Sequence, residues 1–397
     1  MLTHLDPDFA ADPHPTWDAL RAEAPLTHVA EIDAWVITGN DVMREALRHP
    51  DLSPSVQYWK HQVAPDPTVE PTPEQRFHAS GLFNVTPDDH VRLRRLINRA
   101  FTPRGVEAQQ AFTDGLVHDL FGPYRPGDHI DLYADVYEQI PVQVISNLVG
   151  FPAEYGDTFK AASDTLVLTL EPLHDDETGR RIDAAILEIE AMIEATVAER
   201  RRQPADDLLS RMLEVEVEED GDRLAFDEMV ALVLGLVIAG SGTTANEMAV
   251  GTYDLLAGAG QWDRLVADPD RLGGAVEEIL RFSTLGYGAP RFAIRDVELA
   301  GRTVAAGDML LCPFAAANHD PAAYADPHRF DLDRPASTHL AFSIGPHYCL
   351  GANLARLEIT SALGGLLGHF PTVRLDGAPA WEHTFLFRNL VSLPVRL

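Results

Sequence analysis

The stretch FSIGPHYCLG, residues 342–351, is the most informative part of this chain. It contains Cys349, and the only other cysteine, Cys312, lies in no comparable motif. Helical periodicity begins at Ala352, so Cys349 stands just before a helix N-terminus, where a thiolate is stabilised. On these grounds alone, Cys349 could be a nucleophile, a metal ligand or an inert buried thiol.

The stretch resembles the haem-binding loop of the cytochrome P-450 family, the haem-thiolate monooxygenases, at Phe342, Gly345, His347, Cys349 and Gly351. The resemblance implies that Cys349 is the axial thiolate of the iron in haem b, iron protoporphyrin IX. It also implies that Phe342 packs against the haem near the sulfur, that Gly345 allows a tight turn, and that His347 reaches a haem propionate. Ser343 departs from the family pattern, which generally has glycine there.

Basic side chains outside this stretch match further haem contacts of the family. His90 and Arg94 lie four residues apart in a helix expected over 86–101, on one face, where they could hold paired carboxylates. The resemblance assigns these two residues, Arg291 and His339 to the haem propionates. A zinc site made by His339 and the histidine of the cysteine loop is the rival interpretation, although their spacing fits no common zinc motif.

A possible ion pair lies in VEEILR, residues 276–281, where Glu278 and Arg281 are one helical turn apart. Such a pair is common in helices and shows little by itself. Together with Arg329 in a later proline-containing segment, it resembles the buried Glu-Arg-Arg network of the family. The resemblance implies a structural role, in which the network holds the cysteine loop so that Cys349 points at the iron.

The run AGSGTTANE, residues 239–247, follows a long apolar segment. Ala239, Gly240 and Thr243 match the oxygen-binding kink of the family's central helix. A threonine hydroxyl can bond back to the preceding turn and open the helix locally. The resemblance implies that Thr243 orients dioxygen and helps to protonate it.

This run departs from the family pattern at Gly242, where the family normally has the Asp or Glu that relays protons. A rerouted relay could be anchored by Asn246, four residues after Gly242, or by Glu247, four residues after Thr243. A solvated helical acid is the alternative for Glu247. The other possibility is a substrate whose own polar group delivers the protons.

Two nucleotide-binding motifs are nearly matched in the same region. Gly240 to Ala245 fits a loose dinucleotide fingerprint, but that fingerprint needs a preceding strand and a βαβ unit, whereas 255–282 is predicted to continue as helix. A P-loop fails because Ser241 stands where lysine is required. We therefore favour a central helix beside the haem.

Composition limits the partners and the architecture. The chain has 397 residues, 46% of them hydrophobic, and a net charge of −30, which argues against nucleic acid. The longest apolar run, 229–239, is shorter than the roughly 20 residues that span a bilayer, so we expect no membrane insertion. Two cysteines and an N-terminus without a signal sequence predict a cytoplasmic protein.

The family resemblance implies one domain over 1–397. It also implies a mainly α, triangular fold with small β-sheets and the haem between a long central helix and the cysteine loop.

Local patterns predict helices over 15–23, 41–47 and 181–201, a strand over 34–38, and an irregular proline-rich segment over 51–84.

The function implied by the resemblance is hydroxylation or epoxidation of an apolar small molecule, such as a natural-product intermediate. The reaction would use O2 and electrons from a ferredoxin and its reductase. Two alternatives stay open: radical coupling or ring closure by the same oxidant, and a haem protein that binds ligands without turnover. Candidate pocket residues are Tyr58, Trp59, Phe83, Leu236, Ala239, Leu285, Tyr287 and Phe385.

Overall fold

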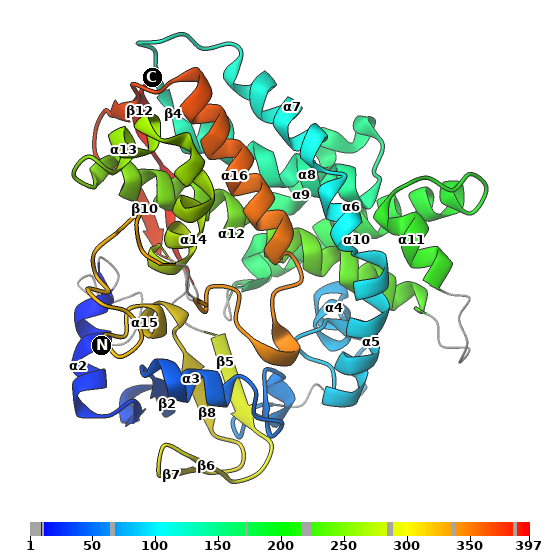
Figure 1. Cartoon of the computed structure of the whole chain (residues 1–397). Coiled ribbons are helices and arrows are strands. Elements are labelled where there is room, and N and C mark those ends of the chain that lie inside the picture. The colour runs from blue at the N-terminus through cyan, green and yellow to red at the C-terminus, as the bar shows by residue number, and fades with distance from the viewer. Residues whose placement is uncertain are drawn as a thin grey trace.

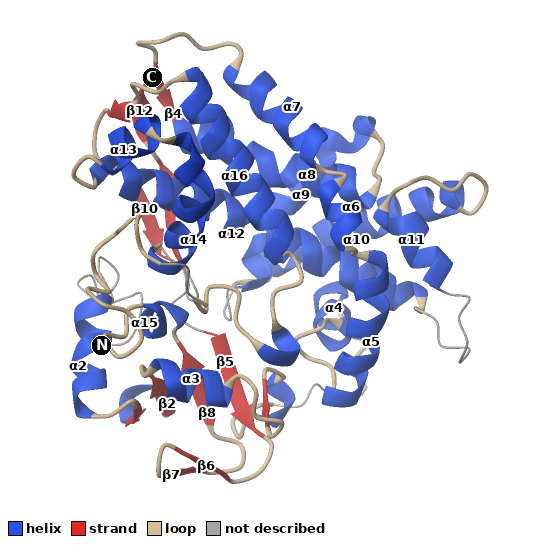
Figure 2. Cartoon of the chain, in the orientation of Figure 1, coloured by secondary structure: helices blue, strands red, loops and turns tan. Residues whose placement is uncertain are grey.

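The computed structural model describes Phe9 and residues 12–63, 68–170, 174–215, 224–283, 289–335, 338–383 and 387–397. Helices make up most of it, and the short strands gather at its margins (Figure 2). The mainly α architecture with small sheets is the one that the sequence predicted. The candidate residues Leu285, Tyr287 and Phe385 lie outside the described residues.

The helical part is built around α12 (Phe226–Ala257), which crosses its middle (Figure 1). A helix that is apolar on all sides belongs inside a protein, and α12 buries side chains such as Met229, Val233 and Val237. It is long and apolar enough to span a membrane, but 61% of its most apolar window is buried by the fold, as in the core helix of a water-soluble protein. Helices that pack on it include α4 (Pro73–Ser80), α8 (Gln139–Val149), α9 (Gly156–Leu166), α14 (Leu272–Phe282) and α16 (Ala352–His369).

Further helices complete this part of the molecule. They are α5 (Pro87–Ala100), α6 (Pro103–Glu107), α7 (Gln110–Phe121), α10 (Asp176–Arg200), α11 (Leu208–Glu214) and α13 (Gln261–Ala267). Helix α5 begins as predicted, because the Thr86 side chain accepts a hydrogen bond from the Asp89 amide at its first turn.

The largest sheet has the strand order β1-β2-β8-β5-β3. Its strands are β1 (Leu26–Val29), β2 (Ala34–Ile37), β3 (Leu52–Ser53), β5 (Ala289–Ala293) and β8 (Met309–Cys312). Only the β2–β8 pair of this sheet is parallel. Helices α2 (His14–Glu23), α3 (Asn40–Ala46) and α15 (Phe314–Asn318) lie beside it (Figure 1).

Three smaller sheets lie apart from this one. Their strands are β4 (His129–Asp131), β12 (Pro394–Arg396) and β9 (Arg374–Leu375) in the first, β10 (Ala380–His383) and β11 (Arg388–Ser392) in the second, and β6 (Val297–Leu299) and β7 (Arg302–Val304) in the third.

Two local predictions are wrong. The segment 51–84 is not irregular throughout, since it contains α4, started by a capping box in which Thr72 and Gln75 bond reciprocally. The segment 255–282 is not one helix, because α12 ends at Ala257 and α13 starts after Gly260, whose φ of 72° suits glycine. The other predicted helices and the strand over 34–38 are confirmed within a few residues.

Candidate active site

The cysteine loop is held by its own backbone. The Cys349 amide donates to the Phe342 carbonyl over 3.0 Å, and the Tyr348 amide donates to the Gly345 carbonyl over 3.1 Å. Gly345 has a φ of 77°, and a Cβ there would lie 3.1 Å from the carbonyl oxygen of Leu47. The tight turn expected at Gly345 therefore has two local causes, the left-handed backbone and the close approach of α3's C-terminal end.

Ser343 adopts a left-handed conformation, with a φ of 59°. Its side chain is buried, and its Oγ has no hydrogen-bond partner among the described residues. This position suits glycine, which explains structurally why the serine is a departure.

We expect Ser343→Gly to raise the free energy of unfolding by about 1 kcal/mol, because it removes both the backbone strain and the unsatisfied hydroxyl. Denaturant unfolding of the two proteins measures this difference. Ser343→Ala separates the causes, because it removes the hydroxyl and keeps the Cβ. A glycine variant less stable than the parent would contradict the account.

The Cys349 thiol is accessible to solvent, although many protein atoms surround it. Desolvation raises its pKa, while the Gly351 amide and the guanidinium groups of Arg94 and Arg356 offset part of that rise. The helix start therefore helps the thiolate without outweighing desolvation, contrary to the sequence expectation. Cys312 is fully buried and its pKa is raised to about 11, as for an inert thiol.

A group of basic side chains lies near this thiol, and among the described residues no carboxylate shifts the pKa of His90, Arg94 or His347. The rings of His90 and His347 lie 3.9 Å apart between centroids, and Arg94 donates to the Tyr348 carbonyl over 2.6 Å. Desolvation, followed by repulsion from neighbouring basic groups, lowers the pKa of His90 to about 4 and that of His347 to about 3. Arg291, 4% exposed, contributes to that repulsion.

These basic residues would suit an anionic ligand. Within the described part of the chain, the Arg291 Nε is buried without a hydrogen-bond partner. A buried guanidinium is costly unless an anionic group neutralises it, and the two neighbouring histidines could donate hydrogen bonds to the same anion. Two propionates beside an accessible Cys349 thiol would do so, and the residues present therefore fit a haem with a thiolate ligand.

His339 is not brought into this basic group. Its Nε2 lies 3.1 Å from Glu277 Oε2, and its Nδ1 accepts from the Ala341 amide over 3.3 Å. Both ring nitrogens are thus occupied, which corrects the predicted propionate contact and also removes the zinc alternative with His347. The His339 bond, with help from Arg356, instead lowers the pKa of Glu277 to about 2.

The predicted acid-arginine network is present, but Arg334 takes the place predicted for Arg329. Glu278, 4% exposed, accepts from Arg281 Nε and Nη2 over 2.8 Å each. It also accepts from Arg334 Nε over 3.0 Å and from the Asp331 amide over 3.0 Å. The Arg329 side chain instead pairs with Asp331 and is 65% exposed, so its predicted place is wrong.

Arg334 was missed by sequence reasoning. The signal that could have found it is the second arginine in RFDLDR, residues 329–334. Its guanidinium also donates to the carbonyls of Ala325 and Arg329, which closes the turn around that segment.

The middle of α12 has the hydrogen bond predicted for Thr243, while the helix continues without a break through this region. Thr243 Oγ1 donates to the Ala239 carbonyl over 2.6 Å. Ala239 is exposed in mid-helix, although α12 is buried for most of its length. A Cβ at Gly240 would lie 2.6 Å from Ile145 Cδ1 of α8, so the glycine lets the two helices approach closely. Ala239 and Thr243 therefore lie on a part of α12 that the rest of the fold does not fully cover.

The two candidates for a rerouted relay differ in their surroundings. Asn246 Oδ1 accepts from the Leu390 amide of β11 over 2.6 Å, so it joins α12 to a sheet. Glu247 is 8% exposed, and its Oε1 has no hydrogen-bond partner in the described ranges, so it is not a solvated acid. Burial, followed by the charge of Asp254, raises the pKa of Glu247 well above its usual value.

The predicted pocket residues are placed unevenly. Tyr58 and Trp59 are half-buried near β5, where Trp59 lies 6.1 Å from Phe292 between ring centroids. Leu236 is partly buried against the core, and Phe83 is 61% exposed. Packing against the sheet therefore accounts for Trp59.

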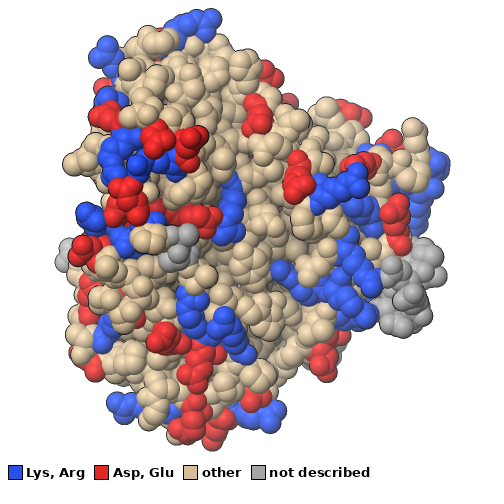
Figure 3. Space-filling model, in the orientation of Figure 1, with Lys and Arg blue, Asp and Glu red and all other residues tan. Residues whose placement is uncertain are grey.

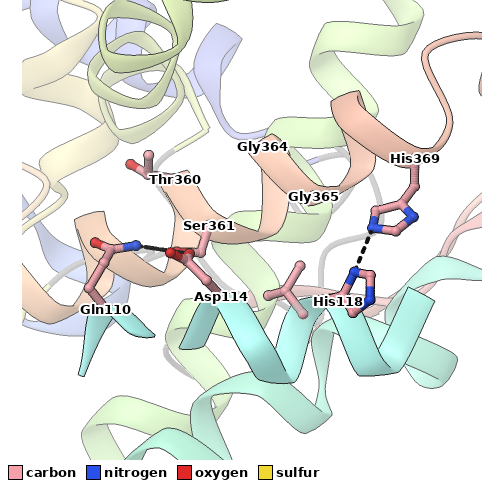
Figure 4. A pocket seen from close by; sticks show the side chains of 9 residues that line it. Gln110, Asp114, His118, Thr360, Ser361, Gly364, Gly365 and His369 are labelled. Atoms are coloured by element: carbon pink, nitrogen blue, oxygen red, sulfur yellow. Dashed lines mark hydrogen bonds between the residues drawn. The ribbon is translucent and has the colours of Figure 1, made fainter. Parts of the chain in front are cut away.

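A hollow between α7 and α16 contains none of the predicted site residues (Figure 4). Its polar groups bond to one another, since Asp114 Oδ1 accepts from Gln110 Nε2 over 2.9 Å and from Ser361 Oγ over 2.6 Å. His118 Nδ1 and His369 Nε2 lie 3.3 Å apart at its other end. The hollow belongs to helix packing and not to the thiol site.

Comparisons with known proteins give one consistent family. The family model "Cytochrome P-450" matches residues 272–387. Cytochrome P-450 monooxygenase PikC of Streptomyces venezuelae is 35% identical, with 100% of this chain and 93% of that protein covered. Epothilone C/D epoxidase of Sorangium cellulosum is 32% identical, with 98% and 94% covered. The structure of epothilone B-bound cytochrome P-450epoK superimposes with a TM-score of 0.88 at 31% identity, covering 98% of this chain and 97% of that one.

Proposed function

Because this chain belongs to the cytochrome P-450 family and is a haem-thiolate monooxygenase, we propose that it hydroxylates or epoxidises a natural-product intermediate. The observation that carries the proposal is the solvent-accessible thiol of Cys349, which lies near the basic side chains of His90, Arg291 and His347. The similarity to an epothilone C/D epoxidase supports a substrate of the natural-product class.

The chain's own residues have distinct tasks in this reaction. Haem b, when bound, supplies the activation of O2 at a thiolate-ligated iron. Cys349 would be the ligand, while Arg291, Arg94, His90 and His347 would contact the propionates. The Thr243 hydroxyl donates to the Ala239 carbonyl, which would fix the position of its oxygen.

We propose that Glu247 supplies the protons in place of the missing acid at Gly242. Burial raises the pKa of its carboxyl well above the usual value, which favours the protonated form, and Glu247 lies one helical turn after Thr243. Asp254, two turns further along α12, has a pKa raised to about 6 by burial and accepts from Ser283 Oγ over 2.6 Å. The two acids form a candidate path for protons toward Thr243.

Glu247→Gln is expected to lower the turnover rate by at least about tenfold and to raise the share of electrons lost as hydrogen peroxide, because an amide of the same shape cannot pass on a proton. Adding Gly242→Glu to that variant should restore part of the coupling. The nearest atom to a Cβ at Gly242 is Val167 Cγ2, at 3.9 Å, so the new side chain has room to start. Product and peroxide yields per NADPH measure both effects.

Glu358→Gln is the matched control for this relay. Glu358 is 1% exposed on α16 with a pKa raised to about 8 by burial, so it is also a buried protonated acid. We expect its amide variant to leave coupling unchanged. Unchanged coupling in Glu247→Gln would contradict the relay and would favour protons delivered by the substrate.

Monooxygenases of this family take electrons from separate partners, and we propose a ferredoxin with its reductase. Positive side chains gather over α5 on one face of the molecule (Figure 3). That helix carries Arg92, Arg95 and Arg99, of which Arg95 and Arg99 are exposed and Arg92 pairs with Glu228. Reduction by an acidic ferredoxin should slow as ionic strength rises.

We propose a cytoplasmic location as well. Cys312 and Cys349 are both unpaired, which suits a reducing compartment.

Product analysis under 18O2 tests the proposed reaction. Compounds that shift the ferric haem spectrum are first selected from a natural-product panel and then turned over with a surrogate ferredoxin and reductase. We expect one labelled oxygen atom in the product. A coupled or ring-closed product without label would favour radical coupling, and no turnover of any bound compound would favour a ligand-binding protein.

A further inference from the structure

Three histidines from separate segments meet at the N-terminal side of the molecule. His14 is the first residue of α2, His319 follows the last residue of α15, and His328 lies in the loop beyond. One ring nitrogen of each lies within 4.8 Å of those of the other two. The ring centroids of His14 and His319 are 4.0 Å apart, and those of His319 and His328 are 5.2 Å apart. Helices α2 and α15 lie side by side in Figure 1.

Two nitrogens of this cluster are buried without a hydrogen bond. Across the described residues, neither His14 Nδ1 nor His319 Nε2 has a partner. His319 is 1% exposed, and its Nδ1 lies 3.0 Å from the Ala315 carbonyl oxygen. The carbonyl can only accept, so His319 Nδ1 carries the proton and Nε2 keeps its lone pair. Buried polar atoms normally have partners, so this lone pair needs an explanation.

The rings are in the protonation state that metals bind. Burial lowers the pKa of His14 to about 4, with His328 and Arg388 acting in the same direction and Asp12 and Asp18 opposing them. Burial also lowers the pKa of His319 well below its usual value, with His14 and Arg281 contributing. Both imidazoles are therefore neutral at neutral pH, as metal ligation requires.

Acidic side chains support the cluster from outside. Asp18 Oδ2 lies 2.9 Å from His328 Nε2, which leaves His328 Nδ1 available as a ligand atom. Asp12 Oδ1 accepts from the His14 amide over 3.0 Å. A carboxylate or carbonyl bonded to the second ring nitrogen is the usual outer support of a metal-binding histidine, and the cluster has one of each.

We propose that His14, His319 and His328 bind one divalent transition-metal ion, of which zinc is the prime candidate. This site is separate from the site around the Cys349 thiol. Neutral imidazole ligands suit zinc, nickel and copper rather than magnesium or calcium. Two nitrogens at about 2.1 Å from one ion are at most about 4.2 Å apart, so the cluster must contract slightly on binding. His328 can supply that movement, because its side chain is 44% exposed.

Such an ion would link three segments next to the acid-arginine network. Arg281 Nη1 donates to the carbonyls of Asn318 and Pro327, the residues that precede His319 and His328. Binding at the histidines would therefore fasten α2 to the framework that supports the cysteine loop. The ion would have a structural role.

Zinc titration of the holoenzyme, made without a polyhistidine tag and stripped with a chelator, tests the proposal. Calorimetry with zinc chloride should show one ion per chain with micromolar or tighter affinity. His328→Ala should weaken this binding by more than about tenfold. Excess zinc should raise the melting temperature of the parent by a few degrees and leave that of His328→Ala unchanged.

His328 is the first position to change because its exposed ring can be removed without opening the core, whereas His319→Ala alone could fail to fold. His118→Ala is the matched control, since His118 and His369 form a histidine pair between α7 and α16, outside the proposed site (Figure 4). Zinc affinity should be the same in that variant and in the parent. Absence of stoichiometric zinc binding by the parent, or equal affinity in His328→Ala, would overturn the proposal.

Discussion

Glu278→Ala is expected to lower the free energy of unfolding by about 3–5 kcal/mol and to deplete the bound haem. The carboxylate is buried and accepts hydrogen bonds from Arg281, Arg334 and the Asp331 amide. Its removal leaves two guanidinium groups without their counter-charge, and breaking a buried ion pair from one side costs about this much. Denaturant unfolding and the haem-to-protein ratio of the purified variant measure the two effects.

Arg329→Ala is the control for this experiment. Its side chain is exposed and pairs only with Asp331 among the acids that the structure records for it, so we expect a change within about 0.5 kcal/mol. A large loss of unfolding free energy in Arg329→Ala would show that this residue belongs to the network after all. A Glu278→Ala protein with full stability and an intact haem-thiolate spectrum would show that the network is dispensable.

Cys349→Ser is expected to abolish the haem-thiolate spectrum and to reduce monooxygenase activity by several orders of magnitude. Serine keeps the size of the side chain, but an alcohol does not supply the electron donation of a thiolate. The loop should remain folded, because its hydrogen bonds run through the backbone of Cys349 and Tyr348. The carbon monoxide difference spectrum reports the ligand, and circular dichroism reports the fold.

Cys312→Ala distinguishes the loss of a ligand from the loss of any thiol. Cys312 is fully buried on β8, so we expect a stability loss of about 1 kcal/mol and an unchanged spectrum. If Cys312→Ala lost the thiolate signature and Cys349→Ser kept it, the assignment of the ligand would be wrong.

Sequence reasoning succeeded where the chemistry is local. Residues 342–351 contain the proposed thiolate ligand, the turn glycine and a proposed propionate contact within one loop, so the pattern needs no tertiary information. The mid-helix hydrogen bond of Thr243 is similarly local, and the structure confirms it.

The misplaced side chains depend on tertiary packing. Arg329 and Arg334 are five residues apart, and only the turn of the chain decides which one faces Glu278. The His339 side chain bonds to Glu277, an acid 62 positions earlier in the chain. No local sequence pattern reveals this contact. Glu247 is buried because of what packs on its side of α12, and helical spacing alone cannot show this.

The hydrogen bond between Asn246 and the Leu390 amide has a practical consequence for redesign. It connects the middle of α12 to strand β11 at a point about one helical turn after Thr243. Substitutions that shift the β10–β11 hairpin are therefore expected to disturb α12 next to Thr243, the residue proposed to orient dioxygen. We expect selectivity and coupling efficiency to change together, so variants selected for one need to be screened for the other.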